Sequence, residues 1–176
     1  MTTYISILRG INVGGQKKIK MEELKKLYES LGFKNVRTYI QSGNVIFECL
    51  DTNLAKLIHQ IEQNIKNSLG FNVIVFIRTK NEIQKLIKNN PFAKKDLSKL
   101  YVIFLSDIKT KPPTDEINNT KDKTEEFFIS GREIYLFCPK EYGISKLSNN
   151  FFERKLNTSA TTRNWKTVNK LLELAE

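Results

Sequence analysis

Apolar residues follow two spacings along the first half of the chain, and each spacing predicts one kind of element. Short apolar or β-branched runs are typical of strands, whereas apolar residues three or four positions apart are typical of helices. A glycine follows each helical pattern, as expected at a helix end. The predicted order is β-α-β-β-α-β, which is the split βαβ or ferredoxin-like arrangement. Strands are expected at 4–8, 36–41, 44–49 and 73–77, and helices at 21–31 and 54–69.

A looser version of the same pattern occupies the second half. The hairpin sequences at 40–49 and 128–138 both place an apolar residue before a Ser-Gly pair and an apolar strand that ends near a cysteine. This similarity favours a diverged duplication. The predicted elements are a helix at 81–88, strands at 100–105, 126–130 and 133–138, a polar connection at 109–124 with one helical turn, and closing helices at 146–156 and 163–174.

These elements predict an α+β protein of two ferredoxin-like (βαββαβ-type) halves, the second degenerate, with a C-terminal helical pair. The expected halves are 1–79 and 80–176, together forming one compact unit. Between the closing helices, the Ser/Thr-rich segment is expected to be a turn in which Thr161 or Thr162 caps the last helix. An ordinary helical hairpin packed on the second sheet is favoured there over a DNA-reading helix pair.

Composition and charge narrow the class of partner. A chain of 176 residues with 40% hydrophobic content can bury a core without disulfides. Met1-Thr2-Thr3-Tyr4 does not resemble a secretory signal and no apolar run reaches the ~20 residues of a membrane span, so we expect a cytoplasmic protein with no membrane partner. The net charge of +10 favours a polyanion, although frequent Lys, Asn and Ile are also typical of proteins encoded by AT-rich genomes.

Few side chains suit metal or nucleophilic chemistry. The single histidine, His59, falls off the apolar stripe of its helix, which disfavours a histidine metal cluster or a Ser-His-Asp triad. Cys49 and Cys138 lie far apart in sequence, so no zinc motif exists and reduced thiols are expected. No metal and no cofactor is predicted. Tyrosines on the predicted strands are expected to pack within the protein rather than to stack on bases.

Polar residues with glycines gather at one predicted edge of the first sheet. In a βαββαβ sheet with strand order 4-1-3-2, the end of the first strand, the 10–20 loop, the first helix N-terminus and the 41–44 hairpin meet there. Lysines of the loop, glycine amides and the helix dipole would favour an anion. The predicted contacts to a phosphorylated small molecule or nucleic acid are Arg9, Asn12, Gly14, Gly15 and Lys17 for phosphate, and Gln41, Ser42, Gly43 and Asn44 for other polar groups.

Two alternatives stay open at this point. GINVGG lacks the spacing of a phosphate-binding P-loop or a dinucleotide fingerprint, so each turn could also be an ordinary connection. The second alternative is an enzyme that acts on a small nucleotide-like or phosphorylated substrate in a cleft between the halves. Such a cleft would be reached by Lys146, Arg163 and Asn164 from the second half.

Two long strings carry a resemblance to a known family. LRGINVGGQKKIKMEELKKLYESLGFKNVRTYIQSGNVIF at 8–47 and GISKLSNNFFERKLNTSATTRNWKTVNKLLELA at 143–175 resemble the signature regions of the bacterial domain-of-unknown-function 1697 family. The resemblance implies a duplicated α+β fold and brings no established activity, cofactor or catalytic residue. It also implies that twelve residues of the two regions belong to the family pattern, namely Arg9, Asn12, Gly14, Gly15, Gln41, Ser42, Gly43, Asn44, Lys146, Arg163, Asn164 and Trp165.

Overall fold

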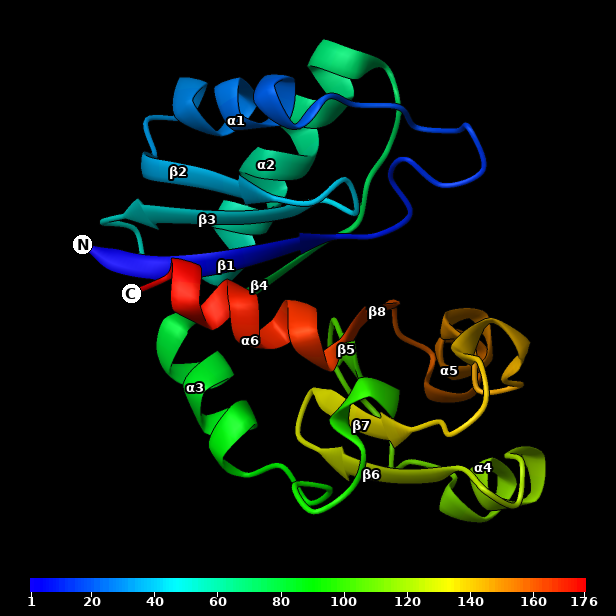
Figure 1. Cartoon of the computed structure of the whole chain (residues 1–176). Helices are drawn as coiled ribbons and strands as arrows, with labels where there is room; N and C mark the ends of the chain where they lie inside the picture. Colours follow the sequence, from blue (N-terminus) through cyan, green and yellow to red (C-terminus); the bar gives the residue numbers. More distant parts are fainter. The chain divides into compact units, whose positions relative to one another are not determined.

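The computed structural model describes residues 1–176, and they divide into two compact units. Unit 1 comprises Met1–Ile87 together with Lys170–Glu176, and unit 2 comprises Lys88–Asn169. Each unit contains one four-stranded antiparallel sheet (Figure 1). No helix of the protein has the length and apolar character needed to cross a bilayer. The predicted fold class of two ferredoxin-like halves is therefore confirmed.

The sheet of unit 1 has the strand order β2-β3-β1-β4, which confirms the predicted order. Helices α1 and α2 cover one face of it (Figure 1), and their apolar side chains form a core with β1, β3 and β4. A further helix, α3, follows β4. The elements of unit 1 are β1 Thr2–Leu8, α1 Met21–Ser30, β2 Lys34–Tyr39, β3 Asn44–Cys49, α2 Leu54–Leu69, β4 Val75–Thr79 and α3 Lys80–Lys88.

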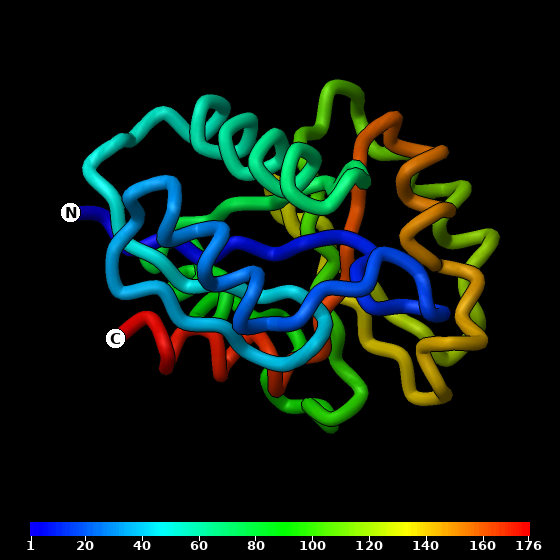
Figure 2. The backbone as a smooth tube through the Cα atoms, turned by 90° about the horizontal axis from the view of Figure 1, so that it is seen from above, coloured from blue at the N-terminus to red at the C-terminus, as the bar shows by residue number.

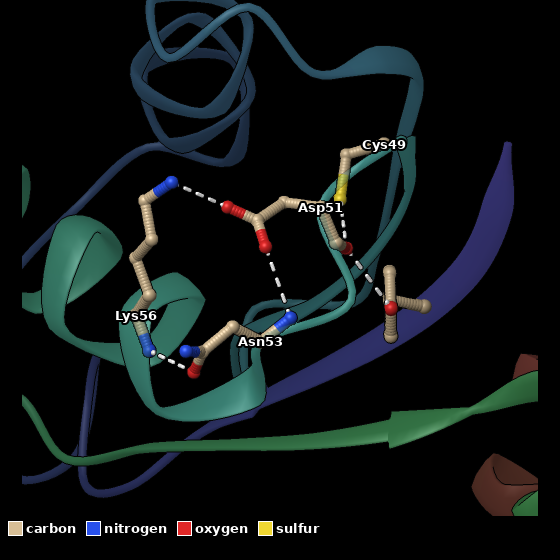
Figure 3. Close-up of polar contacts among 5 residues, drawn as sticks. Cys49, Asp51, Asn53 and Lys56 are labelled. Atoms are coloured by element: carbon tan, nitrogen blue, oxygen red, sulfur yellow. Dashed lines mark hydrogen bonds and ion pairs between the residues drawn. The ribbon is translucent and has the colours of Figure 1, made fainter.

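Local polar contacts fix where α2 begins. The side chain of Asn53 accepts a hydrogen bond from the Lys56 amide, as an N-cap residue does. Asp51 holds this cap from both sides, because its carboxylate accepts from the Asn53 amide at 2.9 Å and from Lys56 Nζ at 2.6 Å (Figure 3). Cys49 Sγ donates to the Asp51 carbonyl (Figure 3). The predicted start of this helix is confirmed, and Gly70 with φ 77° ends it.

The sheet of unit 2 has the equivalent order β6-β7-β5-β8. Helices α4 and α5 contribute Ile117, Phe151 and Phe152 to a core on this sheet. The path of the second half of the chain can be followed from green to red in Figure 2. The remaining elements are η1 Leu97–Lys99, β5 Leu100–Leu105, α4 Thr114–Thr120, β6 Glu126–Ser130, β7 Glu133–Phe137, η2 Tyr142–Ile144, α5 Asn149–Leu156, β8 Ala160–Asn164 and α6 Trp165–Leu174.

One predicted element is wrong. The Ser/Thr-rich segment is not a turn of a helical hairpin, because it contains β8, which pairs with β5 from Ala160 to Asn164. Threonine is a good strand former, and Ala160 and Thr161 are buried in this ladder. The cap of α6 is consequently Asn164, whose side chain accepts from the Thr167 amide at 2.8 Å. Because β8 separates α5 from α6, these two helices are not joined by a short turn as a DNA-reading helix pair would be.

The two units repeat one another in the way that the central hairpin is joined to the first strand of the sheet. Leu8 N donates to Gly43 O at 2.8 Å, and Leu105 N donates to Arg132 O at 2.9 Å, so these two hairpins join their sheets in the same way. By this equivalence Gly43 corresponds to Arg132, and the two Ser-Gly pairs that suggested the duplication are offset by one residue. The structure therefore supports the duplication, but it matches Ser42 with Gly131 rather than with Ser130.

A second equivalence lies at the other edge of each sheet. Arg78 pairs with Ile5 in unit 1, and Arg163 pairs with Val102 in unit 2. Both arginines are buried, and each donates from Nη1 to the carbonyl of the preceding residue, at 3.0 and 2.8 Å. A helix follows each strand at once. The repeat is therefore β-α-β-β-α-β-α, and the strings IRTKNEIQKLI at 77–87 and TRNWKTVNKLL at 162–172 are its matching ends.

Candidate functional site

The 9–20 loop and the β2–β3 hairpin lie at the same edge of unit 1. Leu8 N donates to Gly43 O, and the β1–β3 register pairs Ile7 with Asn44, so the chain of Arg9 leaves the sheet beside the hairpin. Asn12 Nδ2 donates to Gln41 O at 2.8 Å and joins the loop directly to the hairpin. The structure thus brings together the two segments on which the predicted site depends.

Asn12 organises the loop itself. Its side chain makes a two-way contact with Ile19, because Nδ2 donates to Ile19 O at 3.0 Å and Oδ1 accepts from Ile19 N at 2.9 Å. Its backbone N donates to Lys17 O, and its φ of 55° is one that asparagine tolerates better than most residues. A short bridge between Val13 and Gln16 closes the tip. The loop therefore has a defined conformation that hydrogen bonds hold in place.

The hairpin is fixed from inside by Asn44 and Gly43. Asn44 is buried, and its Nδ2 donates to Tyr39 O at 2.9 Å and to Ser42 Oγ at 3.0 Å. A Cβ on Gly43, which has φ 80°, would lie 2.5 Å from Cδ1 of Ile11. Only glycine fits this close approach between hairpin and loop. In this structure Gly43 and Asn44 therefore hold the shape of the edge rather than face solvent.

A pocket of about 630 Å³ opens where the loop returns to α1. Lys18 and Lys20 supply two cations to it, and Glu23 supplies one carboxylate. Helix α1 begins at this point, and no side chain caps its N-terminus. The full lining is Asn12, Gly15, Lys18, Ile19, Lys20, Met21, Glu23 and Gln41.

The lining agrees only in part with the predicted binding residues. Asn12, Gly15 and Gln41 were predicted and line the pocket, whereas the other predicted residues of this edge lie outside its lining. Met21 and Glu23 were not predicted. Their position in the first turn of α1, directly after the lysines, is the sequence signal that points to them. The predicted residues outside the lining are Arg9, Gly14, Lys17, Ser42, Gly43 and Asn44.

The predicted residues of the second half belong to unit 2. Arg163 is buried, its Nη1 donates to Thr161 Oγ1 at 3.1 Å, and burial lowers its pKa to about 10. Asn164 caps α6, and exposed Lys146 lines a small pocket of about 170 Å³ in unit 2. A role for these three residues in a cleft shared with the first half stays a prediction.

The other candidate reactive groups show no arrangement suited to metal or nucleophilic chemistry. His59 is exposed, and the structure holds no cluster of three or more metal-ligating side chains. Both cysteines are free and buried, and burial together with Glu125 raises the pKa of the Cys138 thiol to about 11. Tyr4 stacks on Phe47, with 5.5 Å between ring centroids. These observations leave the loop and hairpin edge as the candidate site of unit 1.

Fold and site together define a duplicated ferredoxin-like α+β protein with a folded, basic strand-to-helix loop. The chain belongs to the family described as a protein of unknown function, DUF1697, whose model matches residues 1–135. The chain is also similar to the solved structure of a conserved bacterial protein from Streptococcus pneumoniae, with a TM-score of 0.72 and 23% identity over 99% of both chains. That likeness shows the fold. No curated protein matches the chain.

Proposed function

We propose that unit 1 binds a phosphorylated ligand of nucleotide size in the pocket between the 9–20 loop and α1. The observation that carries the proposal is the lining of this pocket, where Lys18 and Lys20 meet the uncapped start of α1 and the amide of Gly15. Lysine ammonium groups, helix N-terminal N–H groups and glycine amides are all donors that suit phosphate oxygens. The volume of about 630 Å³ lies within the usual range for small-molecule sites.

The other lining residues favour a ligand with more than a phosphate. Glu23 is an acceptor that would repel an isolated anion, but it suits a ribose hydroxyl or a base amino group. Asn12 binds the main-chain carbonyl of Gln41, whereas the Gln41 side chain is exposed. Its amide group can therefore form hydrogen bonds with the polar edge of a base. Met21 and Ile19 add an apolar wall. This mixture fits a nucleotide better than it fits inorganic phosphate.

A nucleotide can be free or part of a nucleic acid, and the same edge offers a path for a longer strand. Arg9 and Lys17 lie on the loop outside the pocket lining, and Lys17 is exposed. The exposed apolar tips Val13 and Ile40 flank the Asn12–Gln41 contact, where they would meet bases. A binding experiment must therefore compare a mononucleotide with a polynucleotide.

Binding of adenosine 5′-monophosphate, adenosine and a short oligothymidylate to the full chain tests the proposal. The double variant Lys18→Gln with Lys20→Gln is compared with Lys25→Gln plus Lys26→Gln, which removes the same charge from within α1. Hydrogen bonds to charged groups contribute about 1.5–3 kcal/mol, so each pocket lysine removed should weaken phosphate binding by about tenfold or more. The control pair should bind normally.

The three ligands separate the possible outcomes. The proposal predicts that adenosine 5′-monophosphate binds more tightly than adenosine, and that only the pocket variant loses the difference. If oligothymidylate binds, its salt dependence should weaken by about 1.4 in logarithmic slope when two phosphate contacts are lost. Equal losses in the two double variants would mean that only the overall charge matters and would reject the pocket.

A further inference from the structure

Another pocket lies in unit 2 and follows the outer edge of its sheet. It has a volume of about 820 Å³. Strand β6 is the outer strand in the order β6-β7-β5-β8 (Figure 1). Four consecutive residues of β6, Glu126 to Ile129, line the pocket. Since successive side chains of a strand point to opposite faces, a pocket that touches all four runs along the strand edge rather than over one face.

The walls of this pocket are mainly apolar. Phe127 and Ile129 pack against the core under α4, whereas Phe128 lies on the other face beside Tyr135 and is 50% exposed. Residues from the flanking segments complete the walls. The lining is Pro91, Phe92, Ile108, Pro112, Thr114, Asn118, Lys121, Glu126, Phe127, Phe128, Ile129 and Gly131.

The main chain of β6 offers hydrogen-bonding groups in the same place. A two-residue turn at Gly131 and Arg132 joins β6 to β7, with Ser130 paired to Glu133. Alternate residues of an edge strand direct N–H and C=O away from the sheet. Counted from the turn, Phe127 and Ile129 are those residues. The pocket therefore combines apolar walls with a row of main-chain donors and acceptors.

The corresponding edge of unit 1 is protected. Strand β2 carries the charged side chains of Lys34 and Arg37, and its pairing with β3 is interrupted between these two residues. Charges and irregular pairing are the usual means by which proteins blunt an edge strand. In β6 the only charged residue is Glu126, and it is paired with Lys95. The duplication thus contains one blunted edge and one edge that is open and apolar.

We propose that β6 binds an extended peptide segment of another protein, which adds as a fifth strand and places apolar side chains in this pocket. Strand addition uses main-chain bonds for affinity and pockets for alternate side chains for specificity. Lys121 lines the pocket, and the loop that contributes Ile108 and Pro112 also carries exposed Lys109 and Lys111. The complementary peptide therefore alternates apolar and acidic residues. A second copy of the chain is the less suitable partner, since its net charge of +10 opposes self-association.

Selection of a displayed random peptide library on the immobilised full chain tests the proposal. The variant Phe128→Lys introduces the kind of charge that blunts natural edges, and Ile144→Lys adds the same charge at an exposed aliphatic residue outside the pocket. We expect enrichment of peptides that alternate apolar and acidic residues. The affinity of these peptides for the Phe128→Lys variant should be about tenfold lower or more, and their affinity for Ile144→Lys should be unchanged. Both variants gain one positive charge, so attraction of acidic peptides alone would not produce this difference.

Amide hydrogen exchange of the unsubstituted chain provides a readout that does not depend on the variants. Bound peptide should slow exchange at Phe127 and Ile129 by about tenfold or more, and N-methylation of alternate peptide amides should abolish binding. The proposal is overturned if no peptide is enriched, if peptides bind Phe128→Lys equally well, or if the two amides stay unprotected. Binding of the fatty acid decanoate without binding of any peptide would overturn the proposal in favour of a small-molecule site. Dimers of the chain that Phe128→Lys dissociates would overturn it in favour of pairing between two copies of β6.

Discussion

Replacing Gly43 with alanine tests how the hairpin and the loop are joined. Gly43 has φ 80°, a backbone conformation that costs an L-residue about 1–2 kcal/mol. The added Cβ would also lie 2.5 Å from Cδ1 and 2.8 Å from Cγ1 of Ile11, and 3.0 Å from Cβ of Leu8. Both neighbours are buried, so a shift of either side chain would disturb the core around it. Overpacking of this kind costs about 1–3 kcal/mol, and the total expected loss is about 2–5 kcal/mol.

Gly131→Ala is the matched control for this substitution. Gly131 also has a positive φ, of 56°, but a Cβ there would meet nothing within 4 Å. It should therefore lose only the conformational part, about 1–2 kcal/mol. Native-state hydrogen exchange measures both effects locally, because the Leu8 amide donates to Gly43 and the Leu105 amide donates to Arg132 beside Gly131. Equal losses of opening free energy at the two amides would refute the role assigned to the contact with Ile11.

Three further predictions address the loop, the α2 cap and the thiols. Asn12→Ala should destabilise the loop by about 2–4 kcal/mol through three lost hydrogen bonds, measured by urea unfolding, and Asn12→Gly should lose less because glycine accepts the positive φ. The contact with Lys56 lowers the pKa of Asp51 below 3.8; stability from this group is present above that pH and lost as pH falls further, so Asp51→Asn should flatten the acid limb of an unfolding curve. Burial raises the pKa of the Cys49 and Cys138 thiols, so neither should react with a disulfide reagent at pH 8 unless the protein is unfolded.

The fold was predictable wherever local chemistry and tertiary packing agreed. Helix α2 shows this agreement, because its apolar spacing, its cap at Asn53 and its terminal Gly70 all mark the observed boundaries. Strand β8 shows the opposite case. Its residues, Ala160–Asn164, are mostly small or polar, and the ladder with β5 makes them a strand. Such a pairing joins segments about sixty positions apart, and no local pattern contains that information.

The candidate site was predictable in position but not in detail. Strand order was sufficient to bring the loop to the hairpin, and the contact between Asn12 and Gln41 bears this out. The roles of single residues depend on how the loop folds back, which sequence spacing does not reveal. Asn44, for example, is buried and bonded to the Tyr39 carbonyl, and its contact to a ligand stays a prediction. Glu23 was explained by the helix dipole and also lines the pocket.

The most direct test of the central claim is a titration of the isotopically labelled full chain with adenosine 5′-monophosphate, followed through backbone amide chemical shifts. We expect saturable shifts concentrated at Gly15, Lys18, Lys20 and Glu23, at the start of α1 and the end of the loop. The same titration with adenosine should leave these amides nearly unmoved. Saturable shifts confined to other elements, or no saturable shift at the pocket, would contradict the proposal that this edge of unit 1 binds phosphorylated ligands.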